Sequence, residues 1–152
     1  MPEADLEVSR ATIADLETLV PLFDAYRCFY RQTSELERAR HFLKERLERD
    51  QSVIFLAIDS GITIGFTQLY PSFTSTGMAR IFILNDLFVS PYVRRHGVGS
   101  ALIESAVQYG RSAGAVRLAL STELTNTTAQ ALYERSGWTR DTAFCTYQLT
   151  LV

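Results

Sequence analysis

The sequence predicts an α/β (α+β) fold in which a central mixed, mostly antiparallel, twisted sheet of six or seven strands is flanked by about four helices. Two observations predict it. Apolar residues recur at helical spacing before residue 50, in strand-like runs from there to residue 89, and at helical spacing again after residue 97. Turn chemistry at Asp59–Gly61 separates two apolar runs, as in a β-hairpin. Strands and helices therefore alternate along the chain, which favours helices on both faces of one sheet.

The first third of the chain is predicted to be mainly helical. Residues 6–10 can form a short strand, and Thr12 with Asp15 three residues later is typical of a helix start with an acidic first turn. An apolar stripe then runs to residue 30, and Pro21 within it predicts a kink or two abutting helices. Ser34 and Glu37 have the spacing of a capping box, so the next helix is expected over residues 34–49.

The remaining elements follow from the change of period after residue 50. Val53–Ile58 and Ile62–Tyr70 are expected to pair as a hairpin, and a long strand is expected over residues 79–89. A helix from about Gly97 should end at Gly114. The last expected elements are a strand at residues 116–120, a helix at residues 126–136 closed by Gly137, and a strand at residues 144–151, where Cys145, Tyr147, Leu149 and Leu151 alternate with Phe144, Thr146, Gln148 and Thr150.

The stretch from Leu87 to Leu102 contains a strand end, a basic turn with two glycines and the start of a helix. The first four N–H groups of a helix have no partner inside it and, together with the helix dipole, attract an anion. Gly97 and Gly99 lack a Cβ, so an anion can approach the backbone closely. Arg94 and Arg95 add positive charge at the same place. The stretch therefore predicts a binding site for a phosphate or pyrophosphate.

The spacing of the glycines narrows the choice of ligand. A Walker loop needs a lysine after its last glycine, and a dinucleotide fingerprint needs three glycines directly after a strand. The chain instead has Arg94-x-x-Gly97-x-Gly99. This pattern resembles the acyl-CoA-binding loop of the GNAT superfamily of N-acetyltransferases, whose signature is (Q/R)xxGx(G/A). The alternative is a helix start whose glycines serve only for turning.

Residues 126–138 carry a second resemblance to the same superfamily, which has a helix with an Asn, a small residue, a Tyr and then Gly-aromatic. Asn126 and Tyr133 are seven residues apart, so they share one helix face and lie roughly 10 Å apart along its axis. Ala129 between them leaves this face open to a slender chain such as pantetheine. The two motifs occur in the family's order, and the likeness is strongest over residues 79–138. The chain is thus similar to small histone and polyamine acetyltransferase-like members of the GNAT superfamily.

The resemblance implies a GNAT fold over residues 1–152, as a single N-acetyltransferase domain, and acetyl-CoA as the co-substrate. A primary amine of a small molecule or protein would attack the thioester directly, and Tyr133 would be the general acid that protonates the CoA thiolate. A non-catalytic acyl-CoA-binding regulatory module and a transferase for a longer acyl chain are the alternatives. The residues implied in cofactor binding are Leu87, Phe88, Val89, Arg94, Arg95, His96, Gly97, Val98, Gly99, Ser100, Asn126, Ala129 and Tyr133.

The general base and the acceptor site follow less directly from the resemblance. Polyamine acetyltransferases carry a pair of carboxylates where this chain has Asn85 and Asp86. Asn85 cannot take a proton, so Asp86 is the tentative base, acting directly or through water. Glu123 or a water relay without a dedicated carboxylate are alternatives. The first two helices line the acceptor site in this family, and the residues expected there are Tyr26, Phe29, Tyr30 and Asn85.

Composition excludes several other classes of function. The net charge of −2 argues against a nucleic-acid binder with a broad basic surface. The two cysteines and two histidines, Cys28, Cys145, His41 and His96, are too scattered to predict a metal site. No signal peptide or membrane span is evident, so a cytoplasmic location is expected. An apolar last strand at a sheet edge also favours a homodimer.

Overall fold

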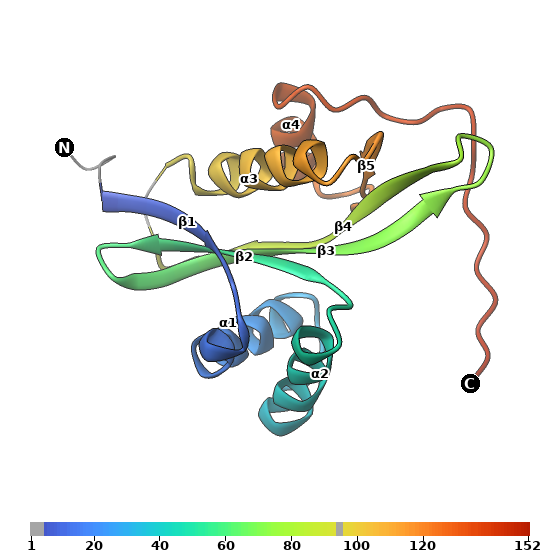
Figure 1. Ribbon diagram of the computed structural model, residues 1–152. Coiled ribbons are helices and arrows are strands. Elements are labelled where there is room, and N and C mark those ends of the chain that lie inside the picture. The colour runs from blue at the N-terminus through green and yellow to red at the C-terminus, as the bar shows by residue number, and fades with distance from the viewer. Residues whose placement is uncertain (1–4, 94–95) are drawn as a thin grey trace. The chain divides into compact units, whose positions relative to one another are not determined.

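The computed structural model describes residues 5–93 and 96–152 of the chain (Figure 1). The chain divides into two compact units, a sheet unit (Met1–Ser121) and a C-terminal unit (Thr122–Val152). The sheet unit contains β1 (Leu6–Arg10), the 3-10 helix η2 (Ile13–Asp15), α1 (Leu16–Phe29), α2 (Leu36–Glu48), β2 (Val53–Asp59), β3 (Ile62–Thr74), β4 (Ala79–Val89), α3 (Val98–Ser112) and β5 (Arg117–Ala119). The C-terminal unit contains α4 (Thr127–Arg135).

One five-stranded sheet organises the sheet unit, in the order β1-β2-β3-β4-β5. The first three pairings are antiparallel, and β4 pairs with β5 in parallel. The predicted mixed, mostly antiparallel sheet with flanking helices is therefore confirmed, with five strands in the described residues rather than six or seven, and the described residues contain four α-helices. The predicted strand at residues 116–120 is present in shortened form as β5.

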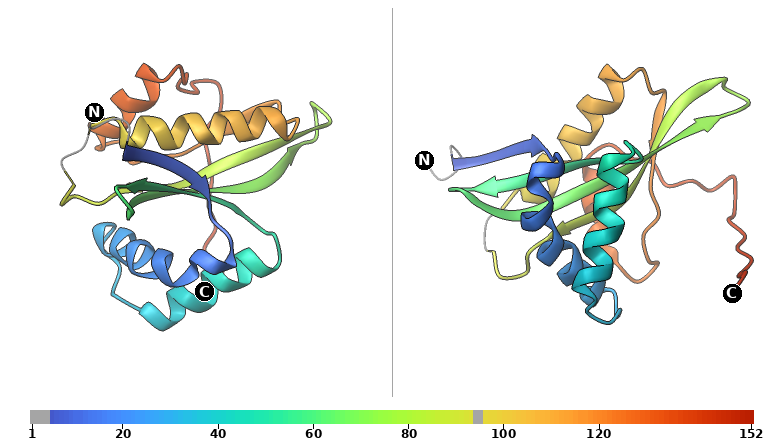
Figure 2. Two further views of the ribbon diagram at one scale, coloured as in Figure 1. Left: turned by 60° about the vertical axis from the view of Figure 1, so that its left-hand side comes forward. Right: turned by 60° about the horizontal axis from the view of Figure 1, so that its bottom comes forward.

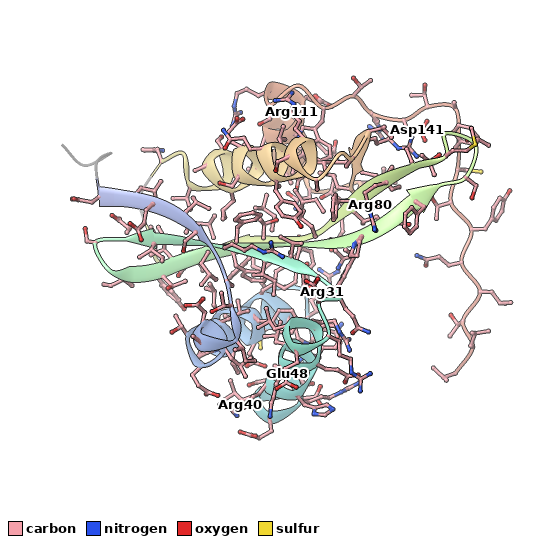
Figure 3. The ribbon with its side chains drawn as sticks, in the orientation of Figure 1. Arg31, Arg40, Glu48, Arg80, Arg111 and Asp141 are labelled. Carbon is pink, nitrogen blue, oxygen red and sulfur yellow. The ribbon has the colours of Figure 1, made fainter. Side chains whose placement is uncertain are left out.

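The helices cover both faces of this sheet. Helices α1 and α2 pack on one face and α3 on the other, as two further views also show (Figure 2). Arg40 on α2 and Arg111 on α3 accordingly lie on opposite sides of the sheet (Figure 3). The buried core on the α1–α2 face contains Leu19, Val20, Phe23, Leu43, Leu56 and Phe66, and the core on the α3 face contains Ala57, Ile64, Val98 and Leu102.

Two β-bulges interrupt the regular register of β3. The first lies where Ala57 pairs with Gly65 and Ile58 pairs with Thr63. A Cβ on Gly65 would lie 2.8 Å from the carbonyl oxygen of Phe88, so only glycine allows this close approach of β3 to β4. The second bulge lies between β3 and β4 and inserts one extra residue into β4. A bulge changes the side to which the following side chains point.

The connection from α1 to α2 is held by a buried carboxylate instead of the predicted capping box. Asp24 Oδ1 accepts the backbone N–H of Glu35 at 2.8 Å, and Asp24 Oδ2 accepts the hydroxyl of Ser34 at 2.6 Å. The residue preceding α2 is Glu35, whose side chain makes no capping bond. The Ser34–Glu37 prediction is wrong because Asp24, ten residues before Ser34 in the sequence, already engages that hydroxyl. The predicted start at Thr12 is confirmed, since Thr12 and Asp15 form a capping box.

Two further predictions about the elements are corrected. Helix α1 continues through Pro21 as one helix, so the alternative of two abutting helices is wrong, and the kink stays a prediction. The predicted strand at residues 144–151 is wrong, because residues 139–152 form neither helix nor strand. A strand needs a hydrogen-bonded neighbour, and alternation of apolar residues alone does not provide one. The helix predicted at residues 126–136 is confirmed as α4, preceded by Asn126 and followed by Gly137.

Candidate active site

Asp86 lies at the second bulge, on the α1–α2 side of the sheet. Gln68 pairs with Asp86 and Leu69 pairs with Leu84, so Asn85 is the extra residue of β4. The side chain of Asp86 is buried, with 5% of the residue exposed. Its Oδ2 accepts Gln68 Nε2 at 2.8 Å and its Oδ1 accepts Asn85 Nδ2 at 3.1 Å. A third donor is the hydroxyl of Tyr26 from α1. The tentative base of the sequence analysis is thus a buried carboxylate held by three donors.

The surroundings of Asp86 perturb its titration and that of a neighbouring tyrosine. Burial raises the pKa of Asp86 above its ordinary value, and the bonds from Gln68, Tyr26 and Asn85 partly oppose this rise. Burial and the nearby charge of Asp86 also raise the pKa of Tyr70 to about 12, against the opposing influence of Arg46. Tyr70 therefore stays protonated near neutral pH, and Asp86 is the group here that can accept a proton.

An aromatic cluster built from α1, the residue that follows it and β4 reaches this carboxylate through Tyr26. The Tyr26 ring lies 5.2 Å from the Tyr30 ring and 5.7 Å from the Phe88 ring, centroid to centroid. Phe29 lies 5.2 Å from Tyr30 and 6.1 Å from Phe88, and 60% of Phe29 is exposed. The structure therefore places the predicted acceptor residues Tyr26, Phe29 and Tyr30 in one aromatic cluster, which touches Asp86 through Tyr26. Asn85, the fourth residue predicted to line the acceptor site, is exposed and lies beside Asp86.

The end of β4 has one edge that no strand covers along the described part of the sheet. Strand β5 pairs only with residues Ile81–Ile83 of β4, whereas β3 pairs with β4 as far as Val89. The outer edge of Leu87–Val89 therefore has main-chain groups available for a ligand. The Phe88 side chain itself is buried in the core on the α1–α2 face, so only its backbone can serve a cofactor. Leu87 and Val89 pack against the core on the α3 face.

The predicted anion site lies at the start of α3. Gly97 precedes the helix with φ +82°, a left-handed conformation that glycine adopts without strain, and no side chain caps the helix there. Val98 is buried, which anchors the first turn, while His96 and Ser100 are exposed. A helix start of this kind leaves its first N–H groups directed outward. The predicted contributions of Arg94 and Arg95 fall on positions outside the described residues.

The second predicted motif lies in the C-terminal unit. Asn126 Oδ1 accepts the backbone N–H of Ala129 at 3.1 Å, so this side chain caps α4. Tyr133 is half-buried, and its ring lies 6.0 Å from the ring of Trp138. Asn126, which precedes α4, and Ala129 and Tyr133 within it are all partly accessible; that they share one helix face stays a prediction.

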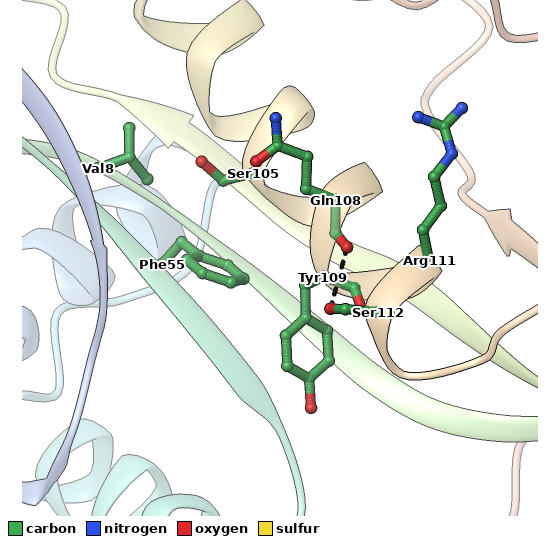
Figure 4. A pocket seen from close by; sticks show the side chains of 7 residues that line it. All are labelled: Val8, Phe55, Ser105, Gln108, Tyr109, Arg111 and Ser112. Atoms are coloured by element: carbon green, nitrogen blue, oxygen red, sulfur yellow. Dashed lines mark hydrogen bonds between the residues drawn. The ribbon is translucent and has the colours of Figure 1, made fainter.

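An open groove of about 760 Å³ lies on the other face of the sheet, along α3 (Figure 4). It is lined by Val8 of β1, Phe55 of β2 and the α3 residues Ser105, Gln108, Tyr109, Arg111 and Ser112. The Ser112 hydroxyl is already bonded to the carbonyl oxygens of Gln108 and Tyr109. None of the predicted site residues lines this groove, so it is not the candidate active site.

Sequence reasoning missed two residues of the site, Gln68 and Tyr70. Gln68 is the only amide within the apolar run of β3, and a polar side chain inside a predicted central strand is the signal that could have found it. Tyr70 is indistinguishable in the sequence from a core aromatic.

In the described part of the chain no group of His, Cys, Asp or Glu side chains could hold a metal ion. No helix there is long and apolar enough to cross a membrane.

Comparisons with known proteins identify the family to which the chain belongs. The sequence matches the Acetyltransferase (GNAT) family over residues 19–138. It is 47% identical over 146 residues, 96% of this chain and 98% of the other, to the uncharacterized N-acetyltransferase YhfO of Bacillus subtilis (strain 168). It is also similar to a crystal structure of a probable acetyltransferase, with a TM-score of 0.92 and 41% identity over 96% of this chain and 98% of the other.

A more distant structure shares the fold and was solved with a ligand. This is an aminoglycoside N-acetyltransferase in complex with CoA, with a TM-score of 0.80 and 20% identity over 95% of this chain and 94% of that one. Since the family match covers most of the chain and a relative is similar over nearly its whole length, the chain belongs to the GNAT family and is an acetyltransferase.

Proposed function

We propose that this protein, as one N-acetyltransferase domain, transfers the acetyl group of acetyl-CoA to a primary amine by direct attack of the amine on the thioester. The observation that carries the proposal is Asp86, a buried carboxylate that is bonded by Tyr26 of the aromatic cluster and directly precedes the uncovered edge of β4. A carboxylate there can receive a proton from an amine, and the strand edge beside it can hold an extended acyl carrier. Membership of the GNAT family supports the same reaction class.

Within the sheet unit, acetyl-CoA binding is assigned to the end of β4 and the start of α3. The pyrophosphate would accept hydrogen bonds from N–H groups between residues 94 and 100, and the pantetheine would pair with the edge of Leu87–Val89. In the C-terminal unit, it is the resemblance to the GNAT motif that assigns Asn126, Ala129 and Tyr133 to the pantetheine. The structure of an aminoglycoside N-acetyltransferase with CoA supports CoA as the ligand of this fold. No step requires a metal ion.

The chemistry divides between two side chains. An alkylammonium with a pKa of about 10.4 must lose a proton before it attacks, which costs roughly 4–5 kcal/mol at neutral pH. Asp86 accepts this proton, and its raised pKa narrows the gap between donor and acceptor. The neutral nitrogen then bonds to the acetyl carbon, the C–S bond breaks, and Tyr133 donates its phenolic proton to the departing thiolate. The amide nitrogen releases its remaining extra proton to solvent, and the Tyr133 phenolate regains a proton from solvent. Because a CoA thiolate has an ordinary thiol pKa of about 8.5, the donation by Tyr133 accelerates the reaction without being indispensable.

The acceptor is assigned to the class of primary amines on an aliphatic stem. The accessible rings of Tyr26, Phe29 and Tyr30, which pack on the buried Phe88, offer flat apolar surfaces for the stem and ring faces for the ammonium charge. A small molecule is favoured, in line with the aminoglycoside acetyltransferase among the structural neighbours, and an amine on a protein is the second candidate acceptor. The cytoplasmic location stays a prediction, and so does the homodimer, although the last strand from which it was expected is absent from the structure.

Thiol release from acetyl-CoA tests the proposal, with spermidine, kanamycin and a lysine-containing peptide as acceptors. Release with at least one amine is expected, with acetylation of that amine visible by mass spectrometry. Tyr133→Phe should lower kcat by about 10²–10⁴-fold and leave CoA affinity in place, whereas the control Tyr147→Phe, an exposed tyrosine, should behave as the parent protein. CoA binding without thiol release with any amine would instead indicate a non-catalytic acyl-CoA-binding module. Equal kcat for Tyr133→Phe and the parent would remove Tyr133 from the mechanism.

A further inference from the structure

Gln68 lies in β3 directly beside Asp86 and has no surface exposed to solvent. Its Nε2 donates to Asp86 Oδ2 at 2.8 Å. Its Oε1 is buried and has no hydrogen-bond partner among the described residues. A buried carbonyl without a partner costs folding stability, which an apolar side chain of the same length would avoid. The amide therefore benefits the molecule only through its bond to Asp86.

The three donors to Asp86 differ in how firmly they are fixed. Asn85 is exposed, and Tyr26 is a half-buried side chain on a helix. Gln68 is fully buried in a central strand, and the strand register places it opposite Asp86. It also binds Oδ2, whereas the exposed Asn85 binds Oδ1. Gln68 is thus the donor that fixes the orientation of the carboxylate from the sheet side.

We propose that Gln68 is the positioning residue for Asp86: its Nε2–H pins Oδ2 to β3 and leaves Oδ1, on the side of the exposed Asn85, to take the proton of the acceptor ammonium. In this step one proton moves from the ammonium nitrogen to Oδ1. The amine becomes neutral, the carboxylate becomes a carboxylic acid, and the proton is later released to solvent. The inference rests on the proposed function, in which Asp86 is the base.

Gln68→Met tests this role because methionine matches the length of glutamine and removes both amide groups. The variant lacks the Gln68 N–H that stabilises the ionised carboxylate. Because this bond opposes the rise in pKa caused by burial, the pKa of Asp86 should rise further without it. From the usual strength of a hydrogen bond to a charged group, the rise should be about one to two pH units. Removal of the unpartnered Oε1 offsets part of the stability that the ionised carboxylate loses with this bond, so the variant should still fold.

Thr67→Val is the matched control. Thr67 is the neighbouring residue of β3, is equally buried, and donates its hydroxyl to the main-chain carbonyl oxygen of Asp86 at 2.8 Å. Valine keeps the shape of threonine and leaves every bond to the Asp86 carboxylate in place. A general disturbance of β3 would affect both variants, whereas loss of the carboxylate donor affects only Gln68→Met.

The first measurement is a carbon-13 NMR titration of the aspartate carboxyl carbons in the full chain without substrate, with the Asp86 signal assigned through Asp86→Asn. The second is the pH profile of kcat/KM for thiol release from acetyl-CoA with the amine that reacts best. Gln68→Met should shift the Asp86 midpoint and the acid limb of the profile upward together, and Thr67→Val should shift neither by more than about 0.3 pH units.

An unchanged midpoint in Gln68→Met, or a shifted midpoint with an unmoved acid limb, would overturn the inference. Equal shifts in Gln68→Met and Thr67→Val would also overturn it, because the effect would then be structural. If the parent protein released no thiol with any amine, the proposed function would fail. The inference would fail with it, since Asp86 would have no proton to accept, and the titration would separately show whether Gln68 controls the carboxyl.

Discussion

Replacing Asp86 with asparagine should make the protein more stable at neutral pH while removing most of its activity. Asp86 is buried at 5% exposure, and the groups that shift its pKa are three neutral donors, without a cationic partner among them. An ionised carboxylate in this position carries a desolvation penalty that an amide of the same size does not. If the Gln68 side-chain amide flips so that its oxygen and nitrogen exchange places, Oε1 can accept the new side-chain N–H of residue 86. The hydrogen bond between the two side chains is then kept.

The sign of the pH dependence follows from the raised pKa of Asp86. A group whose pKa is higher in the folded than in the unfolded state stabilises the fold below its unfolded pKa, and this stability is lost as the pH rises through the folded pKa. As the pH rises from 3.8, the ordinary pKa of Asp86, to its raised pKa in the fold, the parent protein should therefore lose stability relative to Asp86→Asn. At neutral pH the variant should gain about 1 kcal/mol, in the usual range for a single stabilising substitution. This gain corresponds to a rise in Tm of about 2–4 °C for a chain of this size.

Thermal unfolding of both proteins between pH 4 and pH 8, together with thiol-release kinetics, checks this prediction. The gap in Tm should narrow as the pH falls, and kcat/KM should drop by about 10²–10⁴-fold at neutral pH. Glu134→Gln, at an exposed carboxylate of α4, is the control and should change neither quantity. A variant less stable than the parent at neutral pH would show that the charge of Asp86 stabilises the fold. Full activity in the variant would show that Asp86 is not the base.

Three other substitutions test the parts of the fold that frame the site. Asp24→Ala should lower the free energy of unfolding by about 2–4 kcal/mol in urea titrations, because the bonds from Ser34 and Glu35 are lost. The Ser34 bond lowers the pKa of Asp24, so this loss should be full above the ordinary pKa of 3.8 and shrink as the pH falls through the lowered value. Gly65→Ala should cost about 1–3 kcal/mol in the same titrations, because its Cβ would meet a β4 carbonyl oxygen at 2.8 Å. Asn126→Ala should cost about 1 kcal/mol and increase hydrogen exchange at the start of α4, which it caps.

Local signals account for the parts of the fold that the sequence predicts well. The start of α3 is visible in the sequence because Gly97 interrupts an apolar pattern at the point where a left-handed conformation is needed. The cap of α4 is visible for the same reason, since Asn126 and Ala129 are neighbours in the chain. Interactions between distant residues leave no such signal. Ser34 has a short-range capping pattern, but its hydroxyl is bonded to Asp24.

The sequence predicts the aromatic cluster and the Asp86 carboxylate as separate features and does not show that they are in contact. Tyr26 and Asp86 are brought together by the packing of α1 on the sheet, which depends on the whole core of that face. The strand expected at residues 144–151 illustrates the opposite case. Its alternating pattern satisfies the local rule for a strand, yet strand formation depends on a neighbour that no local pattern supplies.

The bulge at Asn85 explains both the position of Asp86 and the failure of sequence periodicity to assign its face. In a regular strand residues 82 and 86 would point to the same side. Phe82 packs on Tyr109 of α3, with ring centroids 5.4 Å apart, whereas Asp86 contacts Tyr26 of α1 on the opposite face. The extra residue reverses the alternation, so that Gln68 and Asp86 share the α1–α2 face while Leu69 and Leu84 share the other. Because Asn85 is inserted into β4, the Asp86 carboxylate points toward the aromatic cluster instead of toward α3.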